Sequence, residues 1–338
     1  MATLLKATKI SKEYVSGTFI KRRNLALRNV TFSIEENPPT ITGIAGESGS
    51  GKTTMARLLA GILEKSSGEL SYKGKPINEM DSKEKMTFRK EVQTIFQDPF
   101  EVYNPFYRVD HVLTTPLKKY GITSNKSDTD KMISSALQEV GLRPDETLGR
   151  FPHQLSGGQR QRIMVARAFL LRPKIIIADE PVSMVDASLR ATILEELKSL
   201  RENHGISIIY ITHDLTTAYQ VADNILILYK GQVVEAGDVE YVINDPKHPY
   251  TKLLIDCIPH PNPDIRWGSD SSNSTSLENR IPKECNNNCL FCIKEGNTDS
   301  LSPMYLVNET RAVCCASYKK SKVCDNEDLS SYFVKRKN

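Results

Sequence analysis

Apolar runs and helix-like periodicities alternate along the first part of the chain. Residues 40–45 (Thr-Ile-Thr-Gly-Ile-Ala) are β-branched and apolar, which predicts a buried strand of a parallel sheet. Apolar side chains then recur at helical spacing at Met55, Leu58, Leu59 and Ile62. Further apolar runs at 94–96, 175–178 and 208–212 predict more strands. This alternation indicates an α/β fold.

Runs typical of strands are scarce between residues 99 and 170. A helix is predicted at the end of this interval, because apolar residues follow a pair of glycines at helical spacing. These residues are Ile163, Val165, Ala166, Ala168, Phe169 and Leu170. We therefore expect a helical subdomain at about 99–170. Beyond it, residues 225–235 predict a β-hairpin that turns at Lys230 and Gly231.

The composition changes near residue 256. The segment from Pro259 to Arg280 is rich in Pro, Asn, Asp and Ser, which is typical of a linker. Six of the seven cysteines lie beyond residue 284. We expect a main domain at 1–256, a linker at 257–284 and a small cysteine-bearing domain at 285–338.

Charge and hydropathy narrow the class of protein. The 338 residues include 45 Lys and Arg and 41 Asp and Glu. The net charge of +4 is too small to favour nucleic acid as a partner. No apolar stretch approaches the ~20 residues of a membrane helix, and the N-terminus lacks the apolar core of a signal peptide. We expect a cytosolic protein that could reach a membrane only by docking on other subunits.

A phosphate-binding loop is predicted directly after the strand at 40–45. The loop consists of Gly46, Glu47, Ser48, Gly49, Ser50, Gly51, Lys52 and Thr53, and Thr54, which follows it, is included in the expected site. Glycines let the backbone approach a polyphosphate with successive N–H groups turned inward, and the N-terminus of the next helix adds positive potential. The Lys52 ammonium would contact the β- and γ-phosphates of ATP, and the Thr53 hydroxyl would bind Mg²⁺.

Two carboxylates, Asp179 and Glu180, end the strand predicted at 175–178. Asp179 would hold Mg²⁺, and Glu180 would polarise the attacking water. General-base positioning is worth ~10²–10⁴ in rate, so Glu180 favours a protein that hydrolyses ATP over one that only binds it. The alternative is that Glu180 is a solvated loop carboxylate.

A second anion site is predicted at the start of the helix near residue 157. Its residues are Ser156, Gly157, Gly158 and Gln159. The chain carries the phosphate loop, this second glycine motif and the acidic strand end in this order. In this arrangement it resembles the nucleotide-binding subunit of an ABC transporter. The resemblance implies a P-loop ATPase with a RecA-like core, an antiparallel β subdomain and a helical signature subdomain. It also implies that residues 156–159 bind the ATP of a partner subunit, so that two chains sandwich two ATPs.

The resemblance implies roles for four more residues. Gln97 matches the loop that senses Mg²⁺ and the transporter, and His213 matches the histidine that contacts the γ-phosphate. Asp186 matches the loop that crosses between subunits, and Tyr14 matches the aromatic residue that stacks on adenine. The remaining histidines are expected at the surface or in turns: His111, His153, His204, His248 and His260.

The cysteines of the tail predict a metal site, because clustered thiols in a cytosolic protein favour a metal over disulfides. Zinc and an iron–sulfur cluster both suit thiolates, and unligated cysteines remain an alternative. Residues 244–254 resemble the segment that closes the main domain in ATPases of oligopeptide and dipeptide permeases, several of which hold a C-terminal 4Fe–4S cluster. The first three tail cysteines lie closer together here than is usual in that family. The expected ligands are Cys285, Cys289, Cys292 and Cys314, with Cys315 as a substitute for the last, while Cys257 and Cys324 are expected to be unligated.

The function that the resemblance implies is ATP hydrolysis that drives an importer for oligopeptides or similar solutes by closing an ATPase dimer. The implied partners are a second, related ATPase, two transmembrane permease subunits and an extracytoplasmic solute-binding protein. The chain would then lie at the cytoplasmic face of the cell membrane. Two alternatives are an oligosaccharide or metal chelate as the cargo, and a soluble ABC ATPase without a role in transport.

Overall fold

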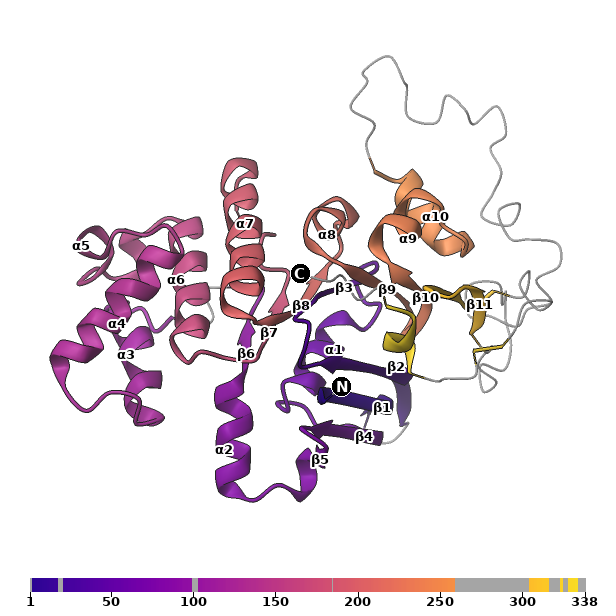
Figure 1. The fold of residues 1–338 in the computed structure, drawn as a ribbon, viewed down its shortest axis with the longest axis horizontal. Coiled ribbons are helices and arrows are strands. Elements are labelled where there is room, and N and C mark those ends of the chain that lie inside the picture. The colour runs from indigo at the N-terminus through magenta and orange to yellow at the C-terminus, as the bar shows by residue number, and fades with distance from the viewer. Residues whose placement is uncertain are drawn as a thin grey trace, which may run out of the picture.

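The computed structural model describes residues 2–17, 21–98, 103–183, 185–258, 304–315, 323–324 and 328–333. The larger of two sheets has eight strands (Figure 1). In spatial order they are β11 (Tyr305–Asn308), β12 (Arg311–Val313), β10 (Gln232–Asp238), β9 (Asn224–Tyr229), β3 (Ile41–Ala45), β8 (Ser207–Thr212), β7 (Ile175–Asp179) and β6 (Val92–Ile95). The run from β9 to β6 is parallel, whereas β10, β12 and β11 add on antiparallel.

The second sheet is antiparallel and has four strands. In spatial order they are β2 (Arg22–Glu35), β1 (Thr3–Ser16), β4 (Ser67–Tyr72) and β5 (Lys75–Pro76). Leu27, Phe32 and Ile34 of β2 share one buried cluster with residues of the larger sheet and of α1 (Lys52–Leu59). The short helix α1 is therefore enclosed between the two sheets, which fixes the loop that precedes it.

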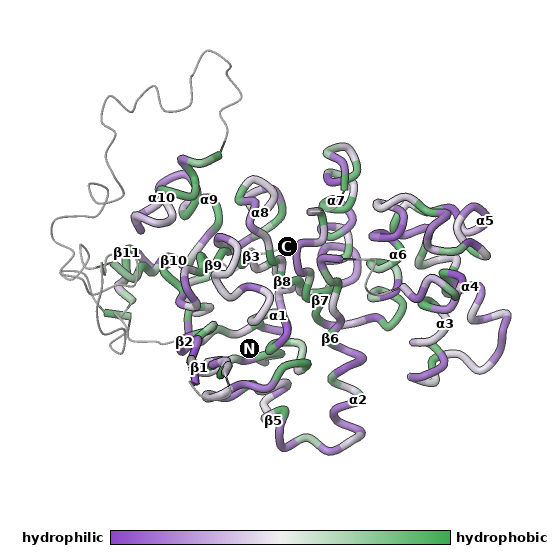
Figure 2. The backbone as a smooth tube through the Cα atoms, turned by 180° about the vertical axis from the view of Figure 1, so that it is seen from behind, coloured by the Kyte–Doolittle hydropathy of each residue, from purple (hydrophilic) through white to green (hydrophobic). Residues whose placement is uncertain are grey.

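Alternate residues of the parallel strands belong to two different cores. Ile177 and Ile209 face the cluster shared with β2, while Ile176 and Ile208 face a cluster formed by helices. Both faces of the sheet are covered, which explains why these strands are continuously apolar rather than alternating. The backbone trace in Figure 2 is accordingly green along the central strands.

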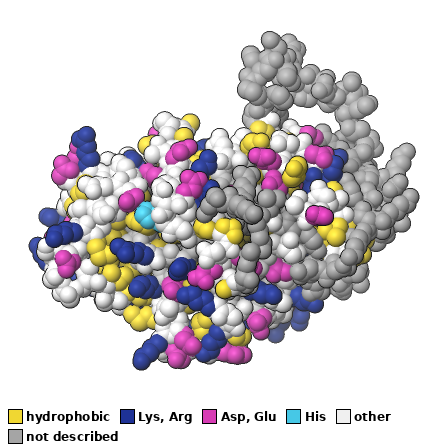
Figure 3. All heavy atoms as spheres, viewed as in Figure 1, with side chains coloured by type: hydrophobic (Ala, Val, Ile, Leu, Met, Phe, Trp, Pro, Cys, Tyr) yellow, Lys and Arg dark blue, Asp and Glu magenta, His cyan; other side chains and the backbone are white. Residues whose placement is uncertain are grey.

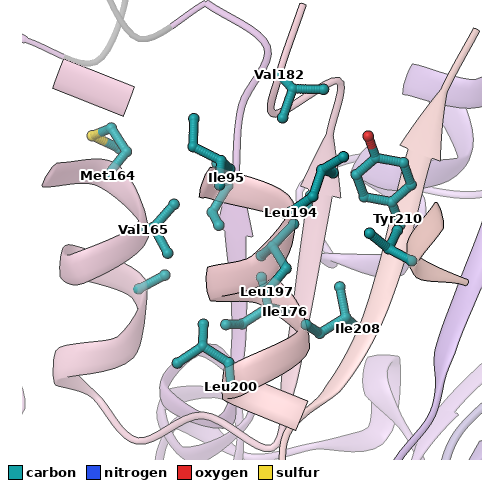
Figure 4. Close-up of a cluster of buried hydrophobic side chains, with 14 of the residues drawn as sticks. Ile95, Met164, Val165, Ile176, Val182, Leu194, Leu197, Leu200, Ile208 and Tyr210 are labelled. Carbon is teal, nitrogen blue, oxygen red and sulfur yellow. The ribbon is translucent and has the colours of Figure 1, made fainter. Parts of the chain in front are cut away.

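Helices α6 (Gly157–Leu170) and α7 (Ala187–His204) cover the second face. Figure 4 shows the contact between these helices and strands β6, β7 and β8. Its labelled side chains are Ile95, Met164, Val165, Ile176, Val182, Leu194, Leu197, Leu200, Ile208 and Tyr210. Helix α6, which begins after Ser156 at the second expected anion site, thus packs against the same sheet that carries the phosphate loop.

The described residues between 103 and 174 contain helices and no strand. Besides α6 they form α3 (Asp110–Lys119), α4 (Lys126–Glu139), α5 (Pro144–Thr147) and the 3₁₀ turn η2 (Pro152–Gln154). These helices gather at one end of the molecule in Figure 1. Asn125 caps α4 by accepting a hydrogen bond from Asp128 N at 2.8 Å, which satisfies one of the donors that a helix start leaves open.

The remaining short elements connect or cover the sheets. They are η1 (Ile77–Glu79), α2 (Ser82–Glu91), α8 (Leu215–Val221), α9 (Val239–Asn244), α10 (Pro249–Asp256) and η4 (Leu329–Tyr332). Helix α2 projects from the molecule and is largely hydrophilic in Figure 2. The hairpin predicted at 225–235 is confirmed, with Lys230 at φ 44° and Gly231 at φ 81°, the left-handed conformations that a tight hairpin turn requires.

The described part of the C-terminal segment joins the main sheet. Strand β12 pairs with β10, and the hydroxyl of Ser330 lies 2.6 Å from that of Ser33 on β2. The domain expected at 285–338 therefore contributes strands to the sheet of residues 1–256. Periodicity could not reveal this pairing, because it joins segments that are far apart in the sequence. Residues 285–303 lie outside the described part of the chain.

The surface carries both signs of charge. On the described part of the face in Figure 3, Lys and Arg side chains are interspersed with Asp and Glu side chains. Among the described residues, none of the helices combines the length and apolarity that crossing a membrane requires.

Replacing Leu197 by Ala should test the core in Figure 4. Leu197 is fully buried, so we expect the change to lower the free energy of unfolding by about 2–5 kcal/mol through lost burial and an unfilled cavity. Ile62→Ala is the control, because Ile62 is 59% exposed and its truncation should change stability little. Urea unfolding followed by circular dichroism measures both, and equal effects would contradict the core assignment.

Candidate active site

Several of the expected site residues meet where four parallel strands end. The phosphate loop follows β3, and Gln97 follows β6. Asp179 ends β7, Glu180 comes directly after it, and His213 follows β8. Because the strands are parallel and adjacent, their carboxyl ends lie along one edge of the sheet, which is where open α/β sheets bind ligands.

Backbone crowding explains two glycines of the phosphate loop. A Cβ atom on Gly46 would lie 2.2 Å from the carbonyl oxygen of Leu228, and one on Gly51 would lie 2.4 Å from that of Ala26. Both residues also have positive φ angles, 158° and 107°. The loop is thus pressed against β2 and β9, with α1 beginning directly after Gly51.

The Lys52 side chain folds back onto the phosphate loop and hydrogen-bonds its backbone. It is 5% exposed, and its Nζ donates to Gly46 O and Glu47 O, each at 2.8 Å. Burial lowers the pKa of Lys52, while the carboxylates of Glu180, Asp179 and Glu47 act in the opposite direction. An ammonium in this position lies close to any anion that the loop amides bind.

Asp179 has the properties of a Mg²⁺ ligand. It is 4% exposed, its carboxylate accepts a hydrogen bond from the Thr53 hydroxyl, and no described residue bonds its Oδ1. Burial raises the pKa of Asp179 above its ordinary value, which is the mark of a charge without enough partners. A carboxylate beside a hydroxyl is a donor set that suits Mg²⁺, so these residues fit the ion.

Glu180 lies between two polar side chains. Its Oε2 accepts from Gln97 Nε2 at 2.7 Å, and its Oε1 lies 2.9 Å from His213 Nδ1. The Glu180 backbone is left-handed at φ 48° and is held by a hydrogen bond from its N–H to Ile211 O at 2.8 Å. Such conformations are strained and collect at functional sites. The Glu180 side chain is 13% exposed, so it is only partly solvated and the expected alternative of a solvated loop carboxylate is disfavoured.

The second expected anion site lies at the start of α6, away from the phosphate loop. Ser156 caps the helix and exchanges hydrogen bonds with Gln159, whose N–H donates to Ser156 Oγ at 3.1 Å. Gly158 packs on α7, where an added Cβ would lie 2.5 Å from Leu189 Cδ1. Both views in Figures 1 and 2 separate α6 from α1, with β6 and β7 between them.

Two expected nucleotide contacts lie elsewhere. Asp186 occupies the cap position of α7, is exposed, and makes no capping hydrogen bond with its side chain. Tyr14 lies on β1 in the four-stranded sheet and is 39% exposed, with Lys12 Nζ 5.3 Å from its ring centroid. An exposed ring of this kind can stack on a flat base.

Comparison with known proteins places this site in a family. The family described as "ABC transporter" matches residues 27–183, and the one described as "Oligopeptide/dipeptide transporter, C-terminal region" matches residues 234–293. The oligopeptide transport ATP-binding protein OppF of Haemophilus influenzae is 36% identical over 88% of this chain and 90% of its own. This chain belongs to the ATP-binding subunits of oligopeptide and dipeptide ABC transporters.

Further relatives and solved structures agree with this family. The dipeptide transport ATP-binding protein DppF of Haemophilus influenzae is 40% identical over 78% of this chain and 80% of its own. The OppF protein of Escherichia coli is 36% identical over 74% of each chain. The dimeric ATP-binding cassette MJ0796, solved with ADP and Pi, is 27% identical with a TM-score of 0.62, over 70% of this chain and 99% of its own.

In this ABC subunit, the expected cysteine ligands are only partly within the described residues. Cys285, Cys289 and Cys292 lie outside them. Cys314 and Cys315 are buried, and Cys314 Sγ accepts a hydrogen bond from Gln232 Nε2 at 3.3 Å. In the part of the chain that the structure describes, no three or more His, Cys, Asp or Glu side chains group as a metal site would require.

One residue of the closing segment is more buried than a turn residue usually is, and another makes a contact that was not anticipated. His248 lies at the bend before α10, as expected for a turn residue, but it is fully buried, and it caps α10 by accepting from Tyr250 N at 3.1 Å. The Tyr250 hydroxyl accepts a hydrogen bond from the backbone N–H of Glu47 in the phosphate loop at 2.9 Å. No local pattern signals this contact, because it spans about two hundred residues of sequence.

Asp179→Asn should raise the thermal unfolding temperature of the nucleotide-free ABC subunit. Burial disfavours the ionised carboxylate, and an amide of the same shape carries no charge. The difference should shrink as the pH falls through the raised pKa of Asp179 toward the ordinary value, because the wild-type carboxyl takes up a proton in the folded state first. ATP with Mg²⁺ should stabilise the variant much less than the wild type.

Differential scanning fluorimetry with and without Mg²⁺ and ATP measures both effects. Asp145→Asn is the control, since Asp145 is exposed on α5 and should alter neither quantity. Full stabilisation of Asp179→Asn by Mg²⁺ with ATP would contradict the assignment of Asp179 as the Mg²⁺ ligand.

Proposed function

We propose that this chain is the ATP-hydrolysing subunit of an ABC importer for oligopeptides or similar solutes. One arrangement carries the proposal: Glu180 lies between Gln97 and His213 at the strand edge where Lys52 closes the phosphate loop. A protein that only bound nucleotide would have no need for a carboxylate held in this strained position.

The phosphate loop supplies backbone N–H groups and Lys52 supplies a positive charge for the β- and γ-phosphates of ATP. Thr53 and Asp179 would hold Mg²⁺, with Gln97 as a further ligand. The ion would offset negative charge on the phosphates. Ser48, Gly49, Ser50 and Thr54 complete the proposed phosphate contacts.

Glu180 is the group that would orient the attacking water and accept its proton. Gln97 donates to one carboxylate oxygen and His213 contacts the other, so the carboxylate plane is fixed before water arrives. His213 is 56% exposed, which leaves its ring accessible to the γ-phosphate. Preorganisation of this kind removes the need to reorient the base during the reaction.

A second ATPase subunit would complete each site. Residues 156–159 begin a helix that lies apart from the phosphate loop of the same chain, which supports a role in binding the nucleotide of a partner. Asp186 would lie at the same junction between subunits. Closure of such a dimer around ATP, and its reopening after hydrolysis, would drive transport.

The remaining partners follow from the transport role. They would be two transmembrane permease subunits and an extracytoplasmic solute-binding protein, with this chain at the cytoplasmic face of the membrane. The names of the relatives favour oligopeptides and dipeptides as cargo over an oligosaccharide, a metal chelate or a soluble role outside transport.

We also propose that the tail binds a 4Fe–4S cluster, with Zn²⁺ as the alternative. The match to the C-terminal region of the transporter family includes Cys285, Cys289 and Cys292. Cys314 would be the fourth ligand, with Cys315 as its substitute. Both side chains are buried, and Cys314 lies beside β10, so solvent competes little for either thiolate.

Glu180→Gln should lower the rate of ATP hydrolysis by about 10²–10⁴ while ATP still binds, because the amide cannot accept a proton from water. The same change should trap a closed dimer that size-exclusion chromatography detects in the presence of ATP. Glu195→Gln is the matched control, since Glu195 is exposed on α7. Normal turnover by Glu180→Gln would contradict the assigned role.

Cys289→Ser should remove the brown colour and ~400 nm absorption that an iron–sulfur cluster gives to anaerobically purified protein, because one thiolate ligand is lost. Cys257→Ser should leave the spectrum unchanged, since Cys257 is exposed at the end of α10. A colourless wild-type protein that contains zinc would favour the Zn²⁺ alternative.

A further inference from the structure

The first peptide of the phosphate loop is held on two sides. On one side, Lys52 Nζ donates to the Gly46 carbonyl oxygen of this peptide and also to the Glu47 carbonyl oxygen of the next peptide. On the other side, the N–H of Glu47 donates to the Tyr250 hydroxyl at 2.9 Å. The hydroxyl belongs to α10, which lies outside the P-loop core, so an element near the end of the main domain fixes the peptide that begins the loop.

The position of Tyr250 is itself closely determined. The residue is 2% exposed, and its ring centroid lies 4.4 Å from that of Tyr229 at the end of β9. Its own N–H donates to the Nδ1 of the buried cap residue His248. The ring therefore has little freedom to follow a loop that moves.

A buried carboxylate anchors the segment that leads into α10. Glu235 on β10 is fully buried, and its two oxygens accept from the N–H groups of Lys247 and His248, each at 3.0 Å. Both bonds end directly before Pro249, where α10 begins. The orientation of Tyr250 thus depends on where the Glu235 carboxylate lies.

Arg311 of the C-terminal segment sets the position of that carboxylate. It is 2% exposed, and its Nε and Nη2 donate to Glu235 Oε1 at 3.0 and 2.5 Å. Nη2 also donates to Asp245 O at 2.6 Å, which ties the same segment a second time. Removing one partner of a buried pair leaves the other charge uncompensated, so the two residues depend on each other.

We propose that Tyr250 is a positioning residue for the phosphate loop, and that the Arg311–Glu235 pair holds it there, so that strand β12 controls the nucleotide affinity of this subunit. The path runs from β12 through Glu235 and His248 to Tyr250 and Glu47, and each step is a hydrogen bond or an ion pair of the structure. A loop that is already in its binding geometry loses less conformational freedom when ATP binds. The inference rests on the proposed ATP site.

Tyr250→Phe tests the last step, because it removes one oxygen and keeps the ring. We expect the KM for ATP and the dissociation constant of ATP to rise about two- to tenfold, the range of one neutral hydrogen bond, with kcat within about twofold. Tyr72→Phe is the matched control. Its hydroxyl is also buried and bonded, to Glu91 at 2.8 Å, but it lies in the four-stranded sheet. Unchanged ATP affinity in Tyr250→Phe would overturn the proposal.

Arg311→Lys tests the path from β12, since it keeps a positive charge beside the buried Glu235 but cannot make the same pair of bonds. We expect Arg311→Lys to weaken ATP binding. In the double variant with Tyr250→Phe, the fold-loss of ATP affinity should be smaller than the product of the two single fold-losses, because both changes act on the same path. Arg143→Lys is the control, because Arg143 pairs with Glu146 at the surface. A lower unfolding temperature with unchanged ATP affinity would overturn the coupling through Arg311.

The wild-type chain separates this inference from the proposed function. If the wild type does not bind ATP, the proposed function fails. If the wild type binds and hydrolyses ATP but Tyr250→Phe behaves like Tyr72→Phe, only the role of Tyr250 fails.

Discussion

Parallel pairing of β3, β8, β7 and β6 is the constraint on which the rest of the structure depends. Each strand needs a crossover that returns along a face of the sheet, so both faces are covered and alternate residues enter two cores. The same pairing places all four strand ends along one edge. Lys52, Gln97, Glu180 and His213 are therefore neighbours although 161 residues separate the first from the last, from position 52 to position 213.

This constraint explains why much of the site could be predicted from the sequence. The phosphate loop, the acidic strand end at Asp179 and the residue after β8 are local patterns, each of which consists of a strand and the residues at its carboxyl end. Once the strands are known to be parallel, their ends must meet. The hairpin at Lys230 and Gly231 could be predicted for a similar reason, because two residues with positive φ determine a turn without help from elsewhere.

Long-range contacts could not be predicted in this way. Nothing local shows that β12 would extend the main sheet, that His248 would be buried, or that Tyr250 would contact Glu47. Two of these segments meet at one buried charge: Glu235 accepts from the N–H of His248 and pairs with Arg311, which comes from a segment 76 residues away. Pairing of that kind depends on the assembled fold, whereas apolar periodicity reports only whether a residue faces inward or outward.

At Lys52, a locally predictable loop and a long-range contact act on the same site. Without a ligand, the ammonium is satisfied by two carbonyl oxygens of its own loop and by the nearby carboxylates of Asp179, Glu180 and Glu47. A polyphosphate must replace those carbonyls as the partner of Lys52, so the Gly46–Glu47 peptide has to remain in place when Lys52 releases it. We expect the hydrogen bond from Glu47 N–H to the Tyr250 hydroxyl to hold that peptide when nucleotide binds, which is why we infer that a residue outside the P-loop core bears on the affinity of the loop.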